Sequence, residues 1–588
     1  MFKKSQHVLF ALVVIASVLL AACAPAPAPA PQAPAAAPAA TKAPPVPAAA
    51  DATATPGVVA IQQQKAAETE LEGEIVISIQ SSDVQTYQAL ADAYMKLHPK
   101  VKVLVELRPP GGEDSYLQWV RTQFAAGTPR VSIMENPHFL DLIQEGRILN
   151  WGPYMNKVNP YTGKKWEESF ETWALNLTRD LTTGELYYLP YMSNQTFWVY
   201  NKDAFKKAGI TDVPPQPTWD QFVDWCKKLK AAGYTCIAQE GVTDRIWGGG
   251  KLPWLMRSAM DQYRRSDVQL ARCQPGDWCY QEAIDSQWKY DPTDPRNDDP
   301  DKVSMNVVRN LAALKDKKIT FDNECTAEMM DQIGRIFKIE NGFVPDGFLG
   351  LKDSYPLFLT GKAAMRLDTG RIFTQFEKDV KALAEGAYPD ASAVSGDQAK
   401  AATAFEIGTF AFPSIDGKCV QGKARANELP SGYLALPKKD RKQNDLEADF
   451  TMFWTSPQGM RIYLANKLDP KNLQGGIQGP TIIKGVELPE KWQKILGSQP
   501  FIGNYEKPGA PADKVARGFW FYEPTKREWA IMVQDFFAGK LSSKDFSTKY
   551  QKLLEDNWDG LLKYLNFTAD DIQHPEKRPP GWVAGGPY

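Results

Sequence analysis

The side chains that most often carry catalysis are few in this sequence, and they do not stand in known catalytic spacings. Gly-x-Ser-x-Gly, His-Glu-x-x-His and Cys-x-x-Cys, which serve acyl transfer, zinc hydrolysis and thiol redox chemistry, do not occur. Gly248-Gly-Gly-Lys251 is similar to part of a phosphate-binding loop, but Arg245 and Leu252 stand where Gly and Ser or Thr are needed. We interpret this segment as a turn. The histidines are His7, His98, His138 and His574.

Paired carboxylates remain as a possible catalytic set. The 70 acidic residues give many pairs, but glycoside hydrolysis depends on a separation in space that sequence spacing does not measure. We expect no enzyme and no cofactor. A secreted glycoside hydrolase, or another carbohydrate-acting enzyme, stays as an alternative, and a cell-surface adhesion or scaffold module is a third class.

One acidic run has the composition of a calcium loop. Asp291-Pro-Thr-Asp-Pro-Arg-Asn-Asp-Asp-Pro-Asp301 is rich in carboxylates. It lacks the glycine and the final glutamate of an EF-hand loop. We therefore expect a solvated loop and no metal site.

Aromatic side chains are abundant, with 17 Trp, 22 Tyr and 27 Phe. Their flat apolar faces suit packing against sugar rings. Most of them are expected in the core or between lobes. The candidates for stacking on a ligand are Trp247, Trp254, Trp278 and Trp520.

Six cysteines remain when Cys23 is set aside, and an even number in an exported chain favours disulfides. Cys273 and Cys279 flank turn residues. Cys226 lies on an expected helix and Cys236 lies just beyond Gly233, which would end that helix. Cys325 and Cys419 are left as the third candidate pair. Buried free thiols are the alternative for each pair, because connectivity cannot be read from sequence.

The elements that would position these groups begin with a strand, a helix and a second strand. Residues 74–79 form an apolar run, residues 87–97 have helical spacing, and residues 101–107 form the next strand. Ser81, Ser82 and Asp83 offer helix-capping side chains. This order predicts a parallel sheet whose first strand-to-helix loop presents ligand-binding groups.

The N-terminus predicts export and lipidation. Residues 1–22 combine a basic start with a short apolar run, which is typical of a signal peptide. Leu20-Ala-Ala-Cys23 resembles a bacterial lipobox, so Cys23 is the expected lipidated residue. Residues 23–71 are mainly Ala and Pro at first and predict a disordered, semi-rigid tether. A lipid anchor on the extracytoplasmic face, extracellular or periplasmic, follows from these features.

The rest of the chain, about 515 residues, is too long for one core, so two lobes or more are expected. The composition, 43% apolar and 23% charged with a net charge of −2, is that of an ordinary globular protein. Basic runs with interleaved aromatics are missing from the sequence, so we expect no nucleic-acid partner.

Several phrases along the chain resemble the extracellular solute-binding proteins of family 1, the maltose-binding type. The most specific of them are Gly184-Glu-Leu-Tyr-Tyr-Leu-Pro-Tyr191, Val199-Tyr-Asn-Lys-Asp-Ala-Phe-Lys-Lys-Ala-Gly209 and Pro217-Thr-Trp-Asp-Gln-Phe222. Supporting phrases are Leu90 to Val103, Phe124 to Pro129, Val131 to Asn136, Leu142 to Leu149, Phe358 to Met365, Gly432 to Pro437 and Phe450 to Ser456.

This resemblance implies an α/β fold with two discontinuous lobes, a hinge and a ligand cleft between the lobes, the type II periplasmic-binding-protein fold. Lobe 1 would hold residues 72–196 and 430–505, and lobe 2 would hold residues 197–429 and 506–588. Residues 241–345 are longer than the usual segment and are expected to be an insertion. Hinge closure would capture a small polar solute, a sugar or oligosaccharide, for an ABC importer permease. Non-sugar solutes such as polyamines, glycerol phosphates or organic anions remain alternatives, and a monomer is expected.

The expected ligand contacts follow from this cleft. Hydroxyl-rich ligands need carboxylates, amides and hydroxyls that accept or donate several hydrogen bonds. Arg371 stands where relatives often carry a stacking tryptophan. An arginine there could bind an anionic group, so an anionic ligand remains an alternative. The candidate residues are Ser82, Asp83, Glu135, Asn136, Tyr191, Asn194, Asp368, Gly370, Arg371 and Trp254.

Overall fold

The computed structural model describes residues 70–579 with gaps. The gaps are residues 80–82, 108–111, 128, 136–139, 180–184, 247–250, 300, 473, 498–502 and 505–522. The expected signal peptide, Cys23 and most of the tether therefore lie outside the described residues. All described residues belong to one compact unit that begins at Gln63.

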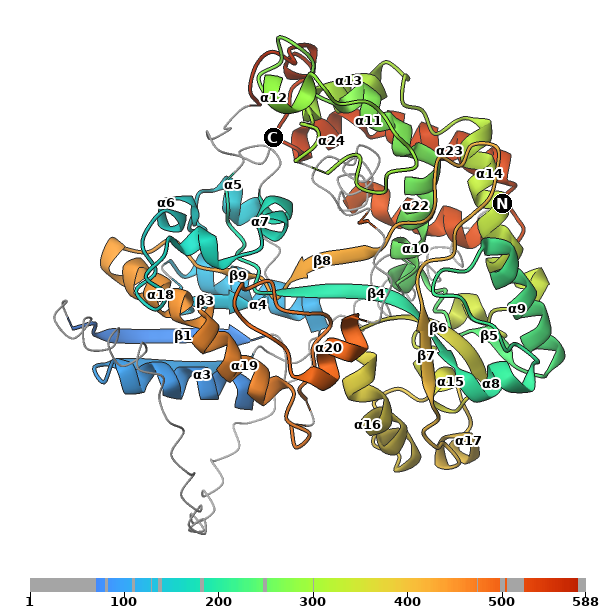
Figure 1. Ribbon diagram of the computed structural model, residues 1–588, viewed down its shortest axis with the longest axis horizontal. Helices are drawn as coiled ribbons and strands as arrows, with labels where there is room; N and C mark the ends of the chain where they lie inside the picture. The colour runs from blue at the N-terminus through green and yellow to red at the C-terminus, as the bar shows by residue number, and fades with distance from the viewer. Residues whose placement is uncertain are drawn as a thin grey trace, which may run out of the picture. The chain divides into compact units, whose positions relative to one another are not determined.

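The first sheet has the strand order β2-β1-β3-β9, and Figure 1 labels β1, β3 and β9. β1 (Gly73–Ile79) is parallel to β2 (Val101–Leu107), with Ile75 opposite Val103, and is parallel to β3 (Ile133–Glu135) on its other side. β9 (Leu434–Ala435) pairs with β3 in the antiparallel sense. The last five residues of β1 are all buried, which is typical of a parallel strand covered on both faces. The predicted parallel opening is thus confirmed.

The first helix, α3 (Val84–Leu97), begins at the expected cap. Asp83 accepts a hydrogen bond from the Thr86 backbone N–H at 3.3 Å, which satisfies one of the free donors of the first turn. Tyr87, Leu90 and Tyr94 form its buried face. The other helices beside this sheet are α4 (Gly112–Ala125), α5 (Leu140–Gln144), α6 (Gly152–Met155), α7 (Thr172–Thr178), α18 (Arg441–Trp454), α19 (Pro457–Lys467) and α20 (Glu490–Gly497).

The second sheet has the order β5-β6-β4-β7, and β8 also pairs with β4. Its long central strand, β4 (Met192–Asn201), is antiparallel to β6 (Ala363–Thr369), β7 (Ile407–Phe410) and β8 (Asn427–Ser431). β5 (Thr235–Ile237) is parallel to β6. Strand β4 therefore belongs to this sheet although it follows the first sheet's segment in sequence.

The remaining helices accompany the second sheet and its C-terminal extension. They are α8 (Lys202–Lys207), α9 (Trp219–Ala231), α10 (Leu252–Arg264), α11 (Val268–Ala271), α12 (Glu282–Asp285), α13 (Val307–Lys315), α14 (Glu324–Phe337), α15 (Tyr355–Leu359), α16 (Ile372–Ala384), α17 (Gly396–Lys400), α22 (Glu523–Phe537), α23 (Ser543–Asp556) and α24 (Trp558–Tyr564). Helix α9 starts with a capping box from Thr218 and Gln221.

Three disulfides join Cys226 to Cys236, Cys273 to Cys279, and Cys325 to Cys419. These are the pairs that the sequence favours. Gly233, which has a φ of 87°, turns the chain after α9 and brings Cys236 back toward it, because glycine adopts a positive φ without steric cost. Among the described residues, no helix is long and apolar enough to cross a membrane.

Candidate functional site

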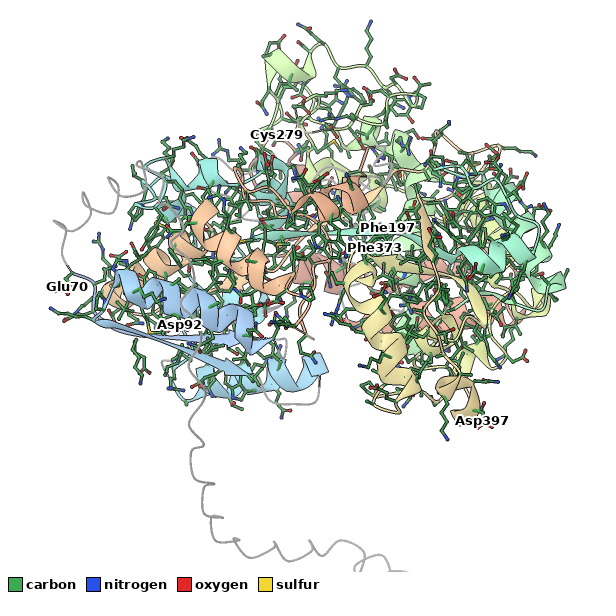
Figure 2. All side chains as sticks on the ribbon, turned by 60° about the horizontal axis from the view of Figure 1, so that its bottom comes forward. Glu70, Asp92, Phe197, Cys279, Phe373 and Asp397 are labelled. Carbon is green, nitrogen blue, oxygen red and sulfur yellow. A yellow bond between two sulfur atoms is a disulfide. The ribbon has the colours of Figure 1, made fainter. Side chains whose placement is uncertain are left out.

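Strand β4 passes from one hydrophobic core into others. Met192 packs with the core of the first sheet, whereas Trp198 and Phe197 pack into two cores around the second sheet. Phe197 lies against Phe373, with ring centroids 5.7 Å apart (Figure 2). The residues between, Ser193-Asn-Gln-Thr196, belong to none of these clusters. A polar stretch therefore separates the cores along a single strand.

Two other segments run beside this polar stretch. β8 pairs with it so that Thr196 lies opposite Asn427 and Gln195 lies opposite Glu428. On the other side, the backbone N–H groups of Ser193 and Gln195 donate to the carbonyls of Pro480 and Gln478 at 2.7 and 3.2 Å. Three chain segments thus cross at one place, and we call residues 193–196, 427–428 and 478–480 the crossing.

One face of the crossing carries polar atoms without hydrogen-bond partners among the described residues. They are Asn194 Oδ1, Thr196 Oγ1 and both polar atoms of Asn427. Thr196 is 2% exposed and Asn427 is fully buried. A buried polar group without a partner costs about 1–3 kcal/mol, so such a cluster is best explained by a polar guest or by water. Asn194 is the sequence candidate that this face includes.

The other face carries a half-buried carboxylate, that of Glu428. Gln195 donates from Nε2 to Glu428 Oε1 at 3.0 Å, while Gln195 Oε1 and Ser193 Oγ lack hydrogen-bond partners among the described residues. Burial raises the pKa of Glu428, and the hydrogen bond from Gln195 opposes that rise only partly. Among the described residues, the Glu428 carboxylate is thus bound by a neutral amide and forms no ion pair.

A second polar group lies at the end of the first sheet, around Glu135. Tyr191 donates to Glu135 Oε1 at 2.8 Å, and Tyr87 donates to the same oxygen. Burial, followed by the charge of Glu135, raises the pKa of both tyrosines well above the ordinary value. Both hydroxyls therefore stay protonated donors at neutral pH. Tyr463 completes the group, with its hydroxyl 3.4 Å from that of Tyr191.

The Asp83 carboxylate is already bound by other side chains of the protein. Lys467 Nζ lies 2.7 Å from Asp83 Oδ2, and Asn472 donates to Asp83 Oδ1 at 2.8 Å. Burial works to lower the pKa of Lys467, but Tyr463, Glu135 and Asp83 outweigh it and raise the pKa. The structure thus gives Asp83 the roles of helix cap and ion-pair partner.

A third polar group lies at the end of β6. Lys251 Nζ lies 2.7 Å from Asp368 Oδ1, and Arg366 Nε lies 2.6 Å from Asp368 Oδ2. Burial works to raise the pKa of Asp368, but the two cations outweigh it and lower the pKa. Since Asp368 lies opposite Phe197, this group adjoins the end of the polar stretch. Lys251, which sequence analysis placed in a turn, has a φ of 61° and precedes α10.

The other sequence candidates lie in different settings. Gly370 is pressed against the crossing, because its N–H donates to Gln478 O at 2.9 Å and an added Cβ would lie 2.5 Å from that oxygen. Arg371 is exposed at the start of α16. Trp254 is half-buried against the core around Trp198. Ser82 and Asn136 lie outside the described residues, as do the stacking candidates Trp247 and Trp520.

Sequence reasoning missed Thr196, Gln195, Asn427 and Glu428. A signal for the first two was present, because four polar residues in a row lie between Met192 and Phe197. No comparable signal marks Asn427, which becomes part of the group only through its pairing with Thr196.

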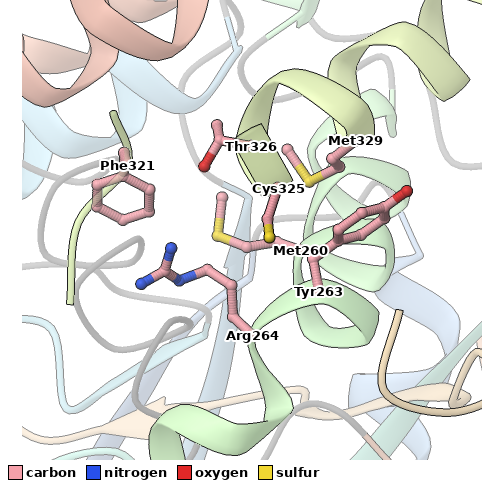
Figure 3. Close-up of a pocket in the computed structure, with 7 residues that line it drawn as sticks. All are labelled: Met260, Tyr263, Arg264, Phe321, Cys325, Thr326 and Met329. Carbon is pink, nitrogen blue, oxygen red and sulfur yellow. The ribbon is translucent and has the colours of Figure 1, made fainter. Parts of the chain in front are cut away.

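The cavity shown in Figure 3 is not suited to a solute. It has a volume of about 10 Å³, which is room for about one water molecule. Arg264 lies over the Phe321 ring, 4.7 Å from its centroid. The lining residues are Met260, Tyr263, Arg264, Phe321, Cys325, Thr326 and Met329.

The acidic run is only partly solvated, because Asp291, Arg296 and Asp301 are exposed whereas the Asp299 side chain is 14% exposed. Asp298 is only 5% exposed and pairs with Arg425, so the expectation of a solvated loop is wrong at this position. Within the described residues, no group of three His, Cys, Asp or Glu side chains could hold a metal ion.

The crossing and the two sheets define a class of protein, the two-lobed type II solute-binding fold. Maltose-bound MalE3 from T. maritima shares this fold, with a TM-score of 0.50 and 13% identity over 82% of this chain and 99% of that one. The GacH receptor of Streptomyces glaucescens, whose structures include a complex with acarbose, has a TM-score of 0.50 and 16% identity over 85% and 100% of the two chains. The expected fold class is confirmed.

Residues 79–286 match the family model of the bacterial extracellular solute-binding proteins, so the family resemblance is confirmed over this segment. Among curated relatives is the sn-glycerol-3-phosphate-binding periplasmic protein UgpB of Pectobacterium atrosepticum, 31% identical over 153 residues, or 25% of this chain and 32% of that protein. UgpB of Escherichia coli K12 is 46% identical over 57 residues, 10% of this chain and 13% of that protein. The chain thus spans under a third of the length of these relatives.

Proposed function

We propose that this protein is the solute-binding component of an ABC importer and captures a small polar solute, a sugar or oligosaccharide, between two lobes. The lobes would be residues 72–196 with 430–505, and residues 197–429 with 506–588. The observation that carries the proposal is the row of unpartnered polar atoms on Asn194, Thr196 and Asn427 at the crossing of the chain segments.

The chemistry of this row suits a polyhydroxylated ligand. An amide both donates and accepts, and a hydroxyl does the same, so Asn194, Thr196 and Asn427 together match neighbouring hydroxyls of a sugar. Each hydrogen bond made there removes the cost of a buried unpaired atom, about 1–3 kcal/mol. The solute would therefore be bound tightly for its size and left chemically unchanged.

Opening and closing at the crossing would admit and enclose the solute. Thr196 and Asn427 are buried and Asn194 is half-buried, so a ligand reaches all three only when the lobes part. A solute that bridges both lobes favours the closed state by its differential affinity. The importer's permease would then recognise the closed form. Cys23, once lipidated, would hold the protein at the membrane on the tether formed by residues 23–71.

A non-sugar solute is the second candidate, and the short matches to sn-glycerol-3-phosphate-binding proteins favour it. A phosphate would have to compete with Asp368 for Lys251 and Arg366, because both cations already pair with that carboxylate. The exposed Arg371 is a further cation beside β6. We therefore rank the neutral polyol above the phosphate ester.

Thermal stability with added solute tests the proposal. Residues 24–588, produced without the lipid, are heated with maltose, raffinose, chitobiose, sn-glycerol-3-phosphate or spermidine. A solute at 100 times its Kd stabilises the native state by about 2.7 kcal/mol. We expect one neutral sugar to raise Tm and, by small-angle scattering, to compact the protein. The Thr196→Val variant should lose most of the shift.

Other outcomes separate the alternatives. A shift with sn-glycerol-3-phosphate alone would replace the sugar by an anionic solute. Recovery of a cleaved sugar would establish the glycoside hydrolase. A sugar that binds without any compaction would contradict closure between lobes.

A further inference from the structure

The acidic loop, residues 291–301, contains one buried carboxylate. Asp298 is 5% exposed. The loop around it is braced by its own contacts: Trp288 donates to the Asn297 carbonyl at 2.8 Å, and Lys302 pairs with Asp294 at 2.6 Å. These contacts fix the backbone of the loop and therefore the position of Asp298.

Asp298 reaches an arginine that is equally buried. Arg425 Nη1 donates to Asp298 Oδ1 at 2.5 Å. Arg425 also donates from Nε to Asp261 Oδ2 at 3.0 Å and from Nη2 to Asp261 Oδ1. Arg265 donates from Nη2 to Asp261 Oδ2 at 2.8 Å. Two arginines and two aspartates thus form one buried, charge-balanced cluster.

Removing one charge from such a cluster is costly, because it leaves another charge buried without its partner. Arg425 is 1% exposed and Asp261 is 8% exposed as side chains, so water does not compensate. The bidentate fork to Asp261 fixes the plane of the guanidinium. With that plane fixed, Nη1 points at Asp298, and the acidic loop determines where Arg425 can lie.

Arg425 stands two residues before Asn427, the first residue of β8. Between them, Ala426 forms a parallel bridge with Asn504, and the Asn504 side chain donates to the Glu428 carbonyl at 2.9 Å. The acidic loop touches this junction as well, since a Cβ added to Gly503 would lie 2.5 Å from the Pro295 carbonyl oxygen. The loop therefore contacts the segment that leads into β8 and also residues 503–504, which lie beside it.

We propose that the acidic loop holds strand β8 in register at the crossing through the Asp298–Arg425 ion pair, and that Asp298 is thereby a positioning residue for the solute. Asp298 would act on binding through Arg425 and Asn427 without touching the ligand. The part that concerns binding rests on the proposed function.

The control is a second bidentate pair close by in sequence, in which the side chains of Asp277 and Arg309 are 3% and 32% exposed. Arg309 donates from Nε and Nη2 to the two oxygens of Asp277 at 2.5 and 2.8 Å. The other partners of Asp277 are the Gln274 backbone and Asn306. Since these partners lie outside the crossing, Asp277→Asn should disturb its own surroundings and leave β8 intact.

Hydrogen exchange of the full mature chain tests the proposal without any solute. In Asp298→Asn, the backbone amides of residues 427–429 and of Ser431 should exchange roughly tenfold faster or more, because local opening follows the stability of the local contacts. In Asp277→Asn they should stay within about twofold of the natural protein. Asp298→Glu, which keeps the charge, should recover part of the protection.

Binding supplies the second readout. The dissociation constant of the sugar that gives the largest rise in Tm should increase at least about tenfold in Asp298→Asn and change little in Asp277→Asn, because only the former alters the pre-organised site. Unchanged exchange at residues 427–429 and Ser431 in Asp298→Asn would overturn the proposal. If that variant does not fold, Arg425→Lys, which keeps the charge but loses the fork, is measured in the same way. If no solute in the panel binds, the proposed function fails, but the exchange comparison still decides whether Asp298 holds β8.

Discussion

Thr196 and Asn427 lie opposite each other across the antiparallel pair of β4 and β8, 231 residues apart in sequence. Both are buried, and the Thr196 hydroxyl and both polar atoms of the Asn427 side chain lack hydrogen-bond partners among the described residues. Most buried polar groups in native proteins are paired. This pair is therefore one of the places where the described residues leave buried polar atoms without partners.

Replacing Thr196 by valine should leave the free protein as stable or more stable by about 1 kcal/mol, because an unpartnered buried hydroxyl is removed at nearly constant shape. The same change should weaken solute binding. Urea unfolding measures the first effect and a thermal shift with sugar measures the second.

Thr86→Val is the control for that substitution. Thr86 is also fully buried, but its hydroxyl donates to Asp83 Oδ2 at 2.8 Å. Its loss should destabilise the protein by about 1–3 kcal/mol. Equal destabilisation by the two variants would show that the Thr196 hydroxyl is paired after all.

Glu428→Gln should change the pH dependence of stability. A raised pKa in the folded protein means that Glu428 contributes stability at low pH, which is lost as the pH rises from the ordinary value of 4.5 through the raised pKa. The amide stays neutral, so the variant should gain Tm over the natural protein at pH 7.5 and hardly at all at pH 4. Glu490→Gln, at a side chain that is 80% exposed, is the control. An equal gain at both pH values would contradict the prediction.

Lys467→Met should destabilise the protein by about 3–5 kcal/mol, because it leaves Asp83 buried without its cation. The side chains of Lys467 and Asp83 are 9% and 0% exposed. Chemical denaturation measures the loss.

Lys102→Met provides the comparison, since Lys102 and Glu74 are 64% and 44% exposed and such pairs contribute about 0–1 kcal/mol. Adding Asp83→Asn to Lys467→Met should recover part of the loss. A double variant worse than the single one would show that Asp83 matters mainly as the cap of α3.

The disulfides should differ in their contribution to stability according to loop length. Cys325 and Cys419 are 94 residues apart, and Cys273 and Cys279 are 6 apart. Chain-entropy arguments give about 4.5 kcal/mol for the long loop and about 2 kcal/mol for the short one. Replacing each pair by alanines and comparing unfolding free energies checks this order. A larger loss from the short loop would mean that Cys273–Cys279 supports native packing directly.

Local sequence determined much of the first sheet. Neighbouring residues are enough to predict the apolar strand at residues 74–79, the helix cap at Asp83 and the strand at residues 101–107. This is because hydrophobic periodicity and helix capping act over a few residues. Gly233 likewise indicated the turn that brings Cys236 back to Cys226. The phrases around Tyr191, Lys202 and Trp219 carried the family resemblance.

Tertiary structure alone decided which polar groups stay unpaired. Asp83 and Glu135 both follow strands in sequence, but Lys467 and Tyr191 engage them in the fold. Nothing in the local sequence marks Asn427, which joins the polar group only because β8 pairs with β4. Asp298 was expected to be solvated, but in the fold it accepts a hydrogen bond from Arg425. Whether a polar side chain is satisfied depends on partners that are distant in sequence, and their approach is set by the packing of whole elements.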